Sequence, residues 1–383
     1  MPVETSPKRL LKVREALASR DVPLDALLLT DLDNIGYLTG FTGSTAQVVV
    51  TSSEALFITD SRYTVQAARE CAGFTQVETP RGSGGYGEAL QSVLKERPSV
   101  QKLGFEAGNV TVAAWKTLRE LSPELEWIGT ESIVENLRMV KDAGEIATIR
   151  HAITVAEAAF LSVKHLLVPG TREQDFALEL EYAMRRGGAE GTAFESIVAS
   201  GSQGARPHHH AGPRPFVTGD FVTIDWGACV DGYNSDITRT VGIGEVTSRQ
   251  REVYAVVLEA QRLAIAAIRP GATGKEIDAI ARDYISAQGF GDAFGHGLGH
   301  SLGRDVHDGP WTSGPPRRPP SRCWPTRRCA PDGAPSSGRQ SSGRPWRLPR
   351  YGEPVRGGPE GYSDRGSNSS PVGTRGVVPR ISS

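Results

Sequence analysis

The composition of the chain changes abruptly after Pro310, and this change limits which residues can build a hydrophobic core. Residues 311–383 consist of Pro, Arg, Gly and Ser for about two-thirds of their length and contain no Lys, Phe or Met. Such a segment buries too little apolar surface to offset the entropy that it would lose on folding. We therefore expect a disordered tail over residues 311–383 and a folded body before it.

Charge follows the same division. The tail holds 13 of the 43 basic residues and 4 of the 44 acidic ones, which gives it a net charge of +9 and leaves −10 for residues 1–310. An acidic folded body argues against nucleic acid as a ligand. The four cysteines show no zinc-type pairing, no signal peptide opens the chain, and no apolar run approaches the roughly 18 residues of a membrane span. We expect a cytoplasmic protein with no membrane or nucleic-acid partner.

The first third of the chain has the hydrophobic pattern of an α/β domain. The expected elements are a helix over 8–20, strands over 25–30 and 46–59, a helix over 64–72 and a glycine-rich loop over 83–87. A long helix is expected to begin near Asp142. We therefore place one domain at 1–135, a second at 140–310 and the tail at 311–383.

The second domain contains an internal repeat. Residues 151–188 and 250–290 each run from a helix through Pro-Gly and a threonine into a second helix that ends at glycine. Each second helix opens with a capping-box pattern, Thr171 with Gln174 and Thr273 with Glu276. The matched order favours a structural repeat. The first copy is followed by strands, so the second copy should be followed by a β-hairpin, and there the tail begins instead.

One hairpin can be aligned residue by residue. Asp231-Gly232 between two alternating runs in "FVTIDWGACVDGYNSDITRTV" is a strong signal for a two-residue turn. That turn pairs Val230 with Tyr233, and counting back along both strands places Asp225 opposite Thr238. One face of the hairpin is then apolar, and the other carries small and acidic residues.

The acidic face brings two carboxylates together. Asp236 lies two residues from Thr238 on the same face, so it is a diagonal neighbour of Asp225, with Cα atoms roughly 7–8 Å apart. Carboxylates at that separation can share metal ions, and the small residues around them suit the close approach of an ion. The alternative is the ordinary solvated face of a half-buried sheet, and the spacing alone does not decide between the two.

Three histidines stand among glycines in "FGHGLGHSLGRDVHDG". His296 and His300 are four residues apart, as in a zinc-binding helix, but the interleaved glycines disfavour a helix. A strand or loop that lets a metal or substrate approach the backbone fits better, and His307 follows eleven residues after His296. A further run, His208–His210, lies on a Pro/Gly loop, and we select His208 from it as a site candidate.

Six stretches resemble one family in their order along residues 8–310. They are "NIGYLTGFTGS", "DSRY", "ENLRMVKDAGEIATIRHA", "SIVASGSQGARPHH", "GDFVTIDWGACVDGYNSDITRT" and "GHGLGHSLGRDVHDGP". They resemble the pita-bread metallopeptidases of the Xaa-Pro dipeptidase and aminopeptidase P type. The resemblance implies a creatinase-like N-terminal α/β domain followed by a pseudo-twofold α/β pita-bread domain, here incomplete. It also implies hydrolysis of the Xaa-Pro bond in dipeptides or at the N-terminus of peptides, and a homodimer or higher homo-oligomer.

The resemblance implies a metal-binding role for three residues. Asp225 resembles the carboxylate that chelates one metal, Asp236 the carboxylate that bridges two, and His300 the imidazole ligand of the second. Carboxylate-rich coordination suits a hard ion such as Mn²⁺, with Co²⁺ or Zn²⁺ as alternatives. Two divalent ions would activate a bridging water to attack the peptide carbonyl and would stabilise the developing negative charge.

The resemblance implies a different role for the remaining histidines. His208, His296 and His307 resemble the family's site histidines that contact the scissile carbonyl, stabilise the tetrahedral intermediate and help to place proline. Arg239 and Arg304 are interpreted as structural or rim charges.

The chain departs from the family after Pro310. The family supplies two further glutamate ligands, in a T-x-E-P-G stretch and in a final R-x-E strand, and neither stretch occurs here. Glu353 and Glu360 stand in "YGEPVRGGPE", without the β-branched strand that should precede them. Our first hypothesis is that the chain as written binds metal poorly and is inactive. Our second is that the tail arises from a shifted reading frame in an intact gene.

Three alternatives to an active Xaa-Pro peptidase share part of this pattern. A methionine aminopeptidase shares the Asp-Asp-His spacing but normally lacks a creatinase-like first domain. A creatinase-type amidinohydrolase has both domains but needs no metal, and Asp225, Asp236 and His300 argue against it. A catalytically dead homologue that binds peptide or acts as a scaffold is favoured by the missing glutamates.

Overall fold

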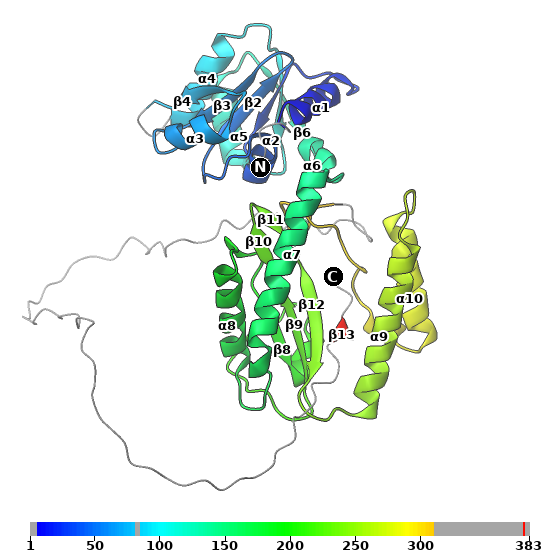
Figure 1. Ribbon diagram of the computed structural model, residues 1–383. Helices are drawn as coiled ribbons and strands as arrows, with labels where there is room; N and C mark the ends of the chain where they lie inside the picture. The colour runs from blue at the N-terminus through cyan, green and yellow to red at the C-terminus, as the bar shows by residue number, and fades with distance from the viewer. Residues whose placement is uncertain (1–5, 81–84, 310–377, 380–383) are drawn as a thin grey trace, which may run out of the picture. The chain divides into compact units, whose positions relative to one another are not determined.

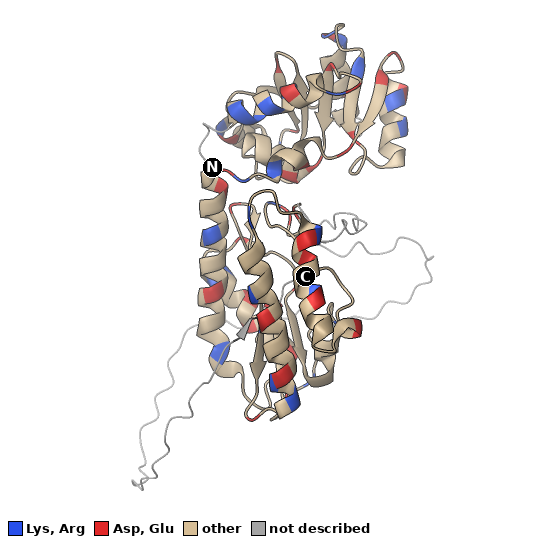
Figure 2. Cartoon of the chain, turned by 90° about the vertical axis from the view of Figure 1, so that its right-hand side faces the viewer, with Lys and Arg blue, Asp and Glu red and all other residues tan. Residues whose placement is uncertain are grey.

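The computed structural model describes residues 6–80, 85–309 and 378–379 (Figure 1). Of the tail it describes only Val378–Pro379, which form the short strand β13 beside β12. The expected disorder of 311–383 and the two tail glutamates otherwise lie outside the described residues. Acidic and basic residues are interspersed along the helices of the described chain (Figure 2).

The N-terminal part is built on a six-stranded sheet with the order β4-β3-β2-β1-β5-β6. Its strands are β1 (Ala26–Leu29), β2 (Gln47–Thr51), β3 (Ala55–Thr59), β4 (Thr75–Glu78), β5 (Lys102–Glu106) and β6 (Glu126–Thr130). Strands β1, β2 and β3 pair antiparallel, whereas β4, β5 and β6 join parallel to their neighbours. The strands expected over 25–30 and 46–59 are confirmed as β1, β2 and β3.

Both faces of the central strands β1, β2 and β3 are buried, which explains their nearly continuous apolar sequences. Leu27 and Val48 pack into one cluster with α1, and Leu28 and Val49 into another with α4, because neighbouring side chains on a strand point to opposite faces. The helices are α1 (Ser6–Ala18), α2 (Leu32–Thr39), α3 (Thr64–Glu70), α4 (Gly85–Lys95), α5 (Val112–Leu121) and α6 (Ile133–Arg138). The expected loop over 83–87 is wrong from Gly85 onward, because α4 begins there.

The second part pairs helices with a smaller sheet. Its helices are α7 (Ala143–Val163), η2 (Lys164–Leu166), α8 (Glu173–Arg186), η3 (Gly201–Ala205), α9 (Ser248–Ala267), α10 (Gly274–Ala287) and η4 (Gly291–Ala293). Its strands are β7 (Gly191–Thr192), β8 (Ile197–Ser200), β9 (Phe221–Trp226), β10 (Ala228–Val230), β11 (Tyr233–Asn234) and β12 (Ile237–Gly242). Strands β8, β9 and β12 adjoin in one sheet, and β7, β10 and β11 form a second one.

Helices α7 and α8 cover the apolar face of the β8-β9-β12 sheet (Figure 1). Trp226 is at its centre: its ring stacks on Phe160 at 4.8 Å, and its indole nitrogen donates to the carbonyl of Ala156 at 2.9 Å. Residues 143–166 have the length and hydropathy of a membrane span. One face of this helix, with Ala152, Ala156 and Phe160, packs into the core. A long core helix can therefore have the length and hydropathy of a membrane span.

The second helix pair has its own small core. Val256, Ala260 and Ala264 of α9 pack against Ile277 and Ala281 of α10, in a cluster separate from that of α7 and α8. The helix-turn-helix order expected for both repeat copies is therefore present in α7–α8 and in α9–α10.

Of the two predicted capping boxes, one is confirmed and one is wrong. Thr273 accepts from the backbone of Glu276, whose side chain accepts from the backbone of Thr273 in return. Helix α8 instead begins after Arg172 with no side-chain cap. Its first N–H groups donate to backbone carbonyls of the 212–214 loop, so the hydroxyl of Thr171 is not needed there.

Candidate functional site

The predicted hairpin register is confirmed. Val230 pairs with Tyr233, and Asp225 lies opposite Thr238. The turn residues Asp231 and Gly232 both have positive φ, 48° and 71°, as a two-residue turn that matches strand twist requires. The sequence therefore fixes which side chains share the face of Asp225.

The hairpin is interrupted at Gly227, where the chain passes from one sheet to the other. A Cβ at this position would collide with the carbonyl oxygen of Ser235 on the opposite strand, so only glycine fits without a shift. Asp236 directly follows this close approach and precedes β12. The interruption thus lies beside the two acids.

The acidic face of the hairpin is largely buried, and only Asp225, Cys229 and Thr240 on it are partly exposed, apart from the side chain of Asp236. Thr223, Asn234 and Thr238 are 7%, 6% and 2% exposed, and the side chain of Asp236 is 9% exposed. The burial of these residues argues against the alternative of an ordinary solvated face. Buried acids need partners that offset the loss of water.

The two acids act on each other. The hydroxyl of Thr238 donates to Asp225 Oδ1 at 2.7 Å. Burial, together with the neighbouring carboxylate of Asp225, raises the pKa of Asp236 well above its usual range. Within the part of the chain that the structure describes, Asp236 Oδ1 is buried and receives no hydrogen bond. A cation or a proton at this position would relieve both the repulsion and the missing partner.

His300 approaches this acid pair from the glycine-rich segment. Its Nε2 lies 3.5 Å from Asp236 Oδ2, and its ring lies edge to face with that of His307 at 4.4 Å between centroids. Burial and the charges of His300 and His208 lower the pKa of His307, against an opposing effect of Asp305. The segment is not helical, as its glycines predicted.

The contacts that the structure describes for His296 are with groups other than Asp225 and Asp236. Its Nδ1 lies 2.8 Å from the carbonyl oxygen of Gly297, and its ring lies edge to face with Phe294 at 5.1 Å. Its own carbonyl accepts from the guanidinium of Arg282 at 2.8 Å. The grouping of His296 with the acid pair stays a prediction.

The triple-histidine loop is held by a residue that the sequence analysis missed. Glu173, fully buried in the first turn of α8, accepts from the backbone and hydroxyl of Ser200, from Gly212 and from His209 Nε2 at 2.9 Å. His209 is therefore the structural member of the run, whereas His208 and His210 are exposed. The only sequence signal for Glu173 is an acidic residue in the first turn of a helix.

Replacing Glu173 tests this arrangement. Burial alone would raise the pKa of Glu173, but the hydrogen bonds from Ser200, His209 and Gly212 outweigh it and lower the pKa, so the residue accepts as a carboxylate. Glu173→Gln keeps the volume but turns an amide donor toward other donors, and we expect a loss of about 1–2 kcal/mol in the free energy of unfolding by urea.

The matched control is Glu195→Gln, which removes an exposed contact to His210 and should change the free energy of unfolding by less than about 0.5 kcal/mol. Equal effects of the two variants would contradict the holding role of Glu173.

The donors at the hairpin fit a divalent cation only in part. Two carboxylates and an imidazole are donors that hard metal ions accept, and Asp236 Oδ1 is an orphaned buried oxygen. Among the described residues, however, no three His, Cys, Asp or Glu side chains are arranged so that they could hold an ion. The described residues by themselves therefore form no three-donor metal site.

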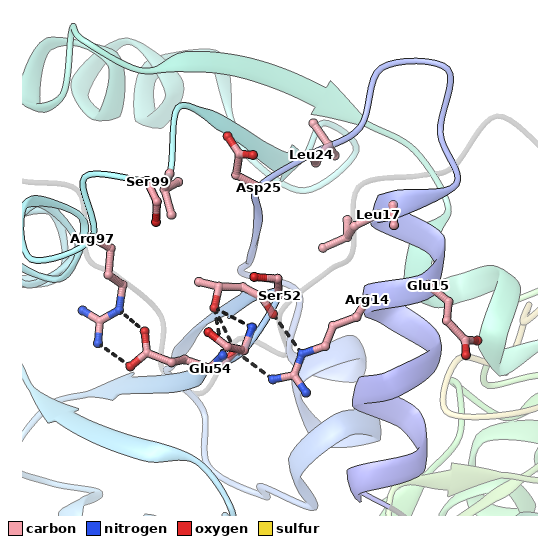
Figure 3. A pocket seen from close by; sticks show the side chains of 13 residues that line it. Arg14, Glu15, Leu17, Leu24, Asp25, Ser52, Glu54, Arg97 and Ser99 are labelled. Carbon is pink, nitrogen blue, oxygen red and sulfur yellow. Dashed lines mark hydrogen bonds and ion pairs between the residues drawn. The ribbon is translucent and has the colours of Figure 1, made fainter.

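A cavity of about 520 Å³ lies elsewhere, in the N-terminal part (Figure 3). Arg14 and Arg97 both reach Glu54 at its rim: Arg97 Nε lies 2.7 Å from the Glu54 carboxylate, and Arg14 donates to the Glu54 backbone. Arg97 and Glu54 thus form an ion pair with each other, and none of the predicted site residues lines this cavity.

Comparisons with known proteins match both parts of the chain. Residues 9–140 match the creatinase/prolidase N-terminal domain, and residues 147–325 match metallopeptidase family M24. The chain is 40% identical over 290 residues to the uncharacterized peptidase YqhT of Bacillus subtilis, covering 76% of this chain and 81% of that protein.

Solved structures agree in sequence and in fold. An Xaa-Pro dipeptidase from Bacillus anthracis is 37% identical with a TM-score of 0.77, and covers 80% of this chain and 85% of its own. An X-Pro aminopeptidase from Thermotoga maritima is 39% identical with a TM-score of 0.70, and covers 76% of this chain and 83% of its own. The expected pairing of a creatinase-like domain with a pita-bread domain is confirmed.

Proposed function

Because this chain belongs to metallopeptidase family M24 and carries a creatinase/prolidase N-terminal domain, we propose that its buried hairpin is part of an Xaa-Pro peptidase site. The observation that carries the proposal is the 3.5 Å approach of His300 Nε2 to Asp236 Oδ2 on a buried acidic face. The substrates would be Xaa-Pro dipeptides or peptides with proline in second position. The protein would act in the cytoplasm, as a homodimer or higher homo-oligomer.

Asp225, Asp236 and His300 are the proposed metal ligands, and Mn²⁺ is the proposed ion. Divalent ions in such a site supply Lewis acidity and a nucleophilic water. The residues themselves contribute their positions. The hairpin register places Asp225 opposite Thr238, and the segment of residues 299–309 brings His300 to Asp236. The hydroxyl of Thr238 holds Asp225 Oδ1, which orients that carboxylate.

His208, His296 and His307 are the proposed substrate-side groups. The lowered pKa of His307 keeps its imidazole neutral near pH 7, so that one ring nitrogen can donate to a peptide carbonyl while the other accepts. His208 belongs to a loop anchored by Glu173 through its neighbour His209. These three residues would orient the Xaa-Pro bond and stabilise negative charge on its oxygen.

The proposed site is incomplete in this chain. Three side-chain ligands hold two divalent ions poorly, and the two further glutamates of the family have no counterpart in the sequence after Pro310. We therefore propose weak metal binding and very low peptidase activity for the chain as written. A second candidate function, peptide binding without hydrolysis, is favoured by the lack of any three-donor group among the described residues.

Metal binding tests the site. Equilibrium dialysis against Mn²⁺ should give weak binding that His300→Ala abolishes and that His210→Ala, on the exposed side of the histidine loop, leaves unchanged. Two tightly bound equivalents in the unaltered chain would contradict the incomplete site. Equal binding by the His300→Ala variant would contradict the assigned ligand.

Peptide assays test the substrate class. An Xaa-Pro dipeptide and a longer Xaa-Pro peptide, each supplied with Mn²⁺, should both be cleaved far more slowly than by an intact relative. Binding of either peptide without cleavage would favour the second candidate function. Cleavage of one peptide at the rate of an intact relative would overturn the proposal of low activity and would distinguish dipeptidase from aminopeptidase.

A further inference from the structure

Arg138, the last residue of α6, is a buried cation outside the proposed ligand set. Its side chain is 4% exposed, and its terminal nitrogen lies 3.2 Å from Asp308 Oδ1. A second nitrogen donates to the side-chain oxygen of Asn34 at 2.7 Å. Arg138 thus joins a residue of α2 to the residue that directly follows His307.

The network continues into the N-terminal sheet. Asn34 donates through its amide nitrogen to Glu106 at 2.7 Å and to Glu135 at 3.1 Å. Glu106 ends strand β5 and also accepts from the backbone of Thr30 at 2.6 Å. Glu106, Asn34 and Arg138 are each less than 9% exposed, so water cannot replace these bonds without opening the structure.

Asp308 is packed as tightly at the other end. It is 4% exposed, and its carboxylate lies directly against Gly303, where a Cβ would collide with it. Lys141 Nζ is a second cation near this carboxylate, at 3.9 Å. The Asp308 carboxylate therefore packs inside a tight turn over 303–308, which contains His307 and begins three residues after His300.

The same turn is fixed from the hairpin side. The backbone N–H of Asn234 donates to the carbonyl of Gly303 at 2.9 Å, and its side-chain amide donates to the carbonyl of Arg304 at 2.8 Å. Asn234 lies two residues before Asp236. The turn over 303–308 thus lies between Asn234 of β11, two residues before Asp236, and the guanidinium of Arg138.

We propose that Arg138 is a positioning residue, which through Asp308 holds His300 at Asp236 and His307 against the ring of His300. Through Asn34 it makes the position of both histidines depend on the N-terminal domain. The inference rests on the proposed function only in taking these histidines as site residues. A buried carboxylate that loses its cation must seek water. Without Arg138, Asp308 would leave the interior, and the segment of residues 299–309 would open with it.

Hydrogen exchange followed by mass spectrometry on the full chain tests this without any metal or substrate. Arg138→Met, which keeps much of the volume and removes the charge, should speed amide exchange over 299–309 by about tenfold or more and leave α8 and β9 within about twofold. The matched control is Arg97→Met, which removes a partly buried arginine paired with Glu54. It should leave exchange over 299–309 unchanged.

Three further variants separate positioning from general stability. Arg138→Lys keeps the charge and should restore most of the protection over 299–309. Asp308→Asn should reproduce the Arg138→Met pattern, and the double variant should be no worse than either single one, because both remove one interaction. Asn34→Ala should give a smaller increase in exchange at the same segment.

The proposal is overturned if exchange over 299–309 does not change in Arg138→Met and Asp308→Asn, or if it rises equally throughout the chain. Failure of Arg138→Lys to restore protection also overturns it. Because exchange needs no bound metal, a failure of the proposed ligand set in the dialysis experiment leaves this result independent.

Discussion

Suppose that residues 311–383 are replaced by the sequence that the gene encodes after Pro310 in the frame containing the two missing glutamate stretches. Xaa-Pro hydrolysis in the presence of Mn²⁺ should then rise by about 10³-fold or more. The reason is electrostatic: two added carboxylates would complete the proposed donor set of Asp225, Asp236 and His300. The measurement is the initial rate on an Xaa-Pro dipeptide for both versions at equal protein concentration. Resequencing the gene after the codon of Pro310 gives the amino-acid sequence to be used for this replacement.

The control for this experiment is the same replacement in a chain that carries Asp236→Asn, which should remain as slow as the chain with its present tail. Fast hydrolysis by that control would show that Asp236 is not needed as a metal ligand. Equal rates for the present chain and the restored chain would refute the idea that the missing glutamates limit activity.

Asp236→Asn should stabilise the metal-free protein at pH 8 by about 1–3 kcal/mol and have little effect at pH 4. Because the pKa of Asp236 is raised in the folded state, the folded protein keeps a proton that the unfolded chain releases above its ordinary pKa of 3.8. Stability of the unaltered protein therefore falls as pH rises from about 4 toward the raised pKa. Asparagine does not ionise, so this fall should vanish.

Urea unfolding in chelator at several pH values measures this difference. Asp220→Asn is the control with the opposite sign. Burial alone would raise the pKa of Asp220, but the neighbouring Arg214 and the backbone N–H of Val217 together outweigh it and lower the pKa. The Asp220 carboxylate therefore stabilises the folded protein at pH values above its pKa in the unfolded chain. Asp220→Asn should lower the free energy of unfolding at neutral pH but not at acid pH. If the free energies of unfolding of Asp236→Asn and of the unaltered protein differed by the same amount at every pH, the proposed repulsion between Asp225 and Asp236 would be refuted.

The hairpin could be predicted to the residue because its determinants are local. Asp231-Gly232 can adopt positive φ, and the alternation of apolar residues on both sides allows one register. The cap at Thr171 was predicted by the same local logic and is wrong, because the first N–H groups of α8 donate to carbonyls some forty residues further along. Local patterns fail where a distant segment provides the partner.

The supports of the site could not be predicted for the same reason. Arg138 and Asp308 are 170 residues apart in the chain, and Glu173 meets His209 across 36 residues. A single arginine or glutamate in a helix carries no sign of such a partner. The sequence thus selected the residues on the acid pair's own face, and the residues that hold them in place emerged only from the three-dimensional contacts.

The separate core of α9 and α10 bears on how the chain folds. Its apolar contacts join residues within one helical hairpin and the short segment after it, so little loop entropy is lost in forming them. Such local units form rapidly and early. Among the described residues, the apolar core of this helix pair contains nothing beyond Leu298, so a change confined to residues 311–383 leaves its apolar contacts in place.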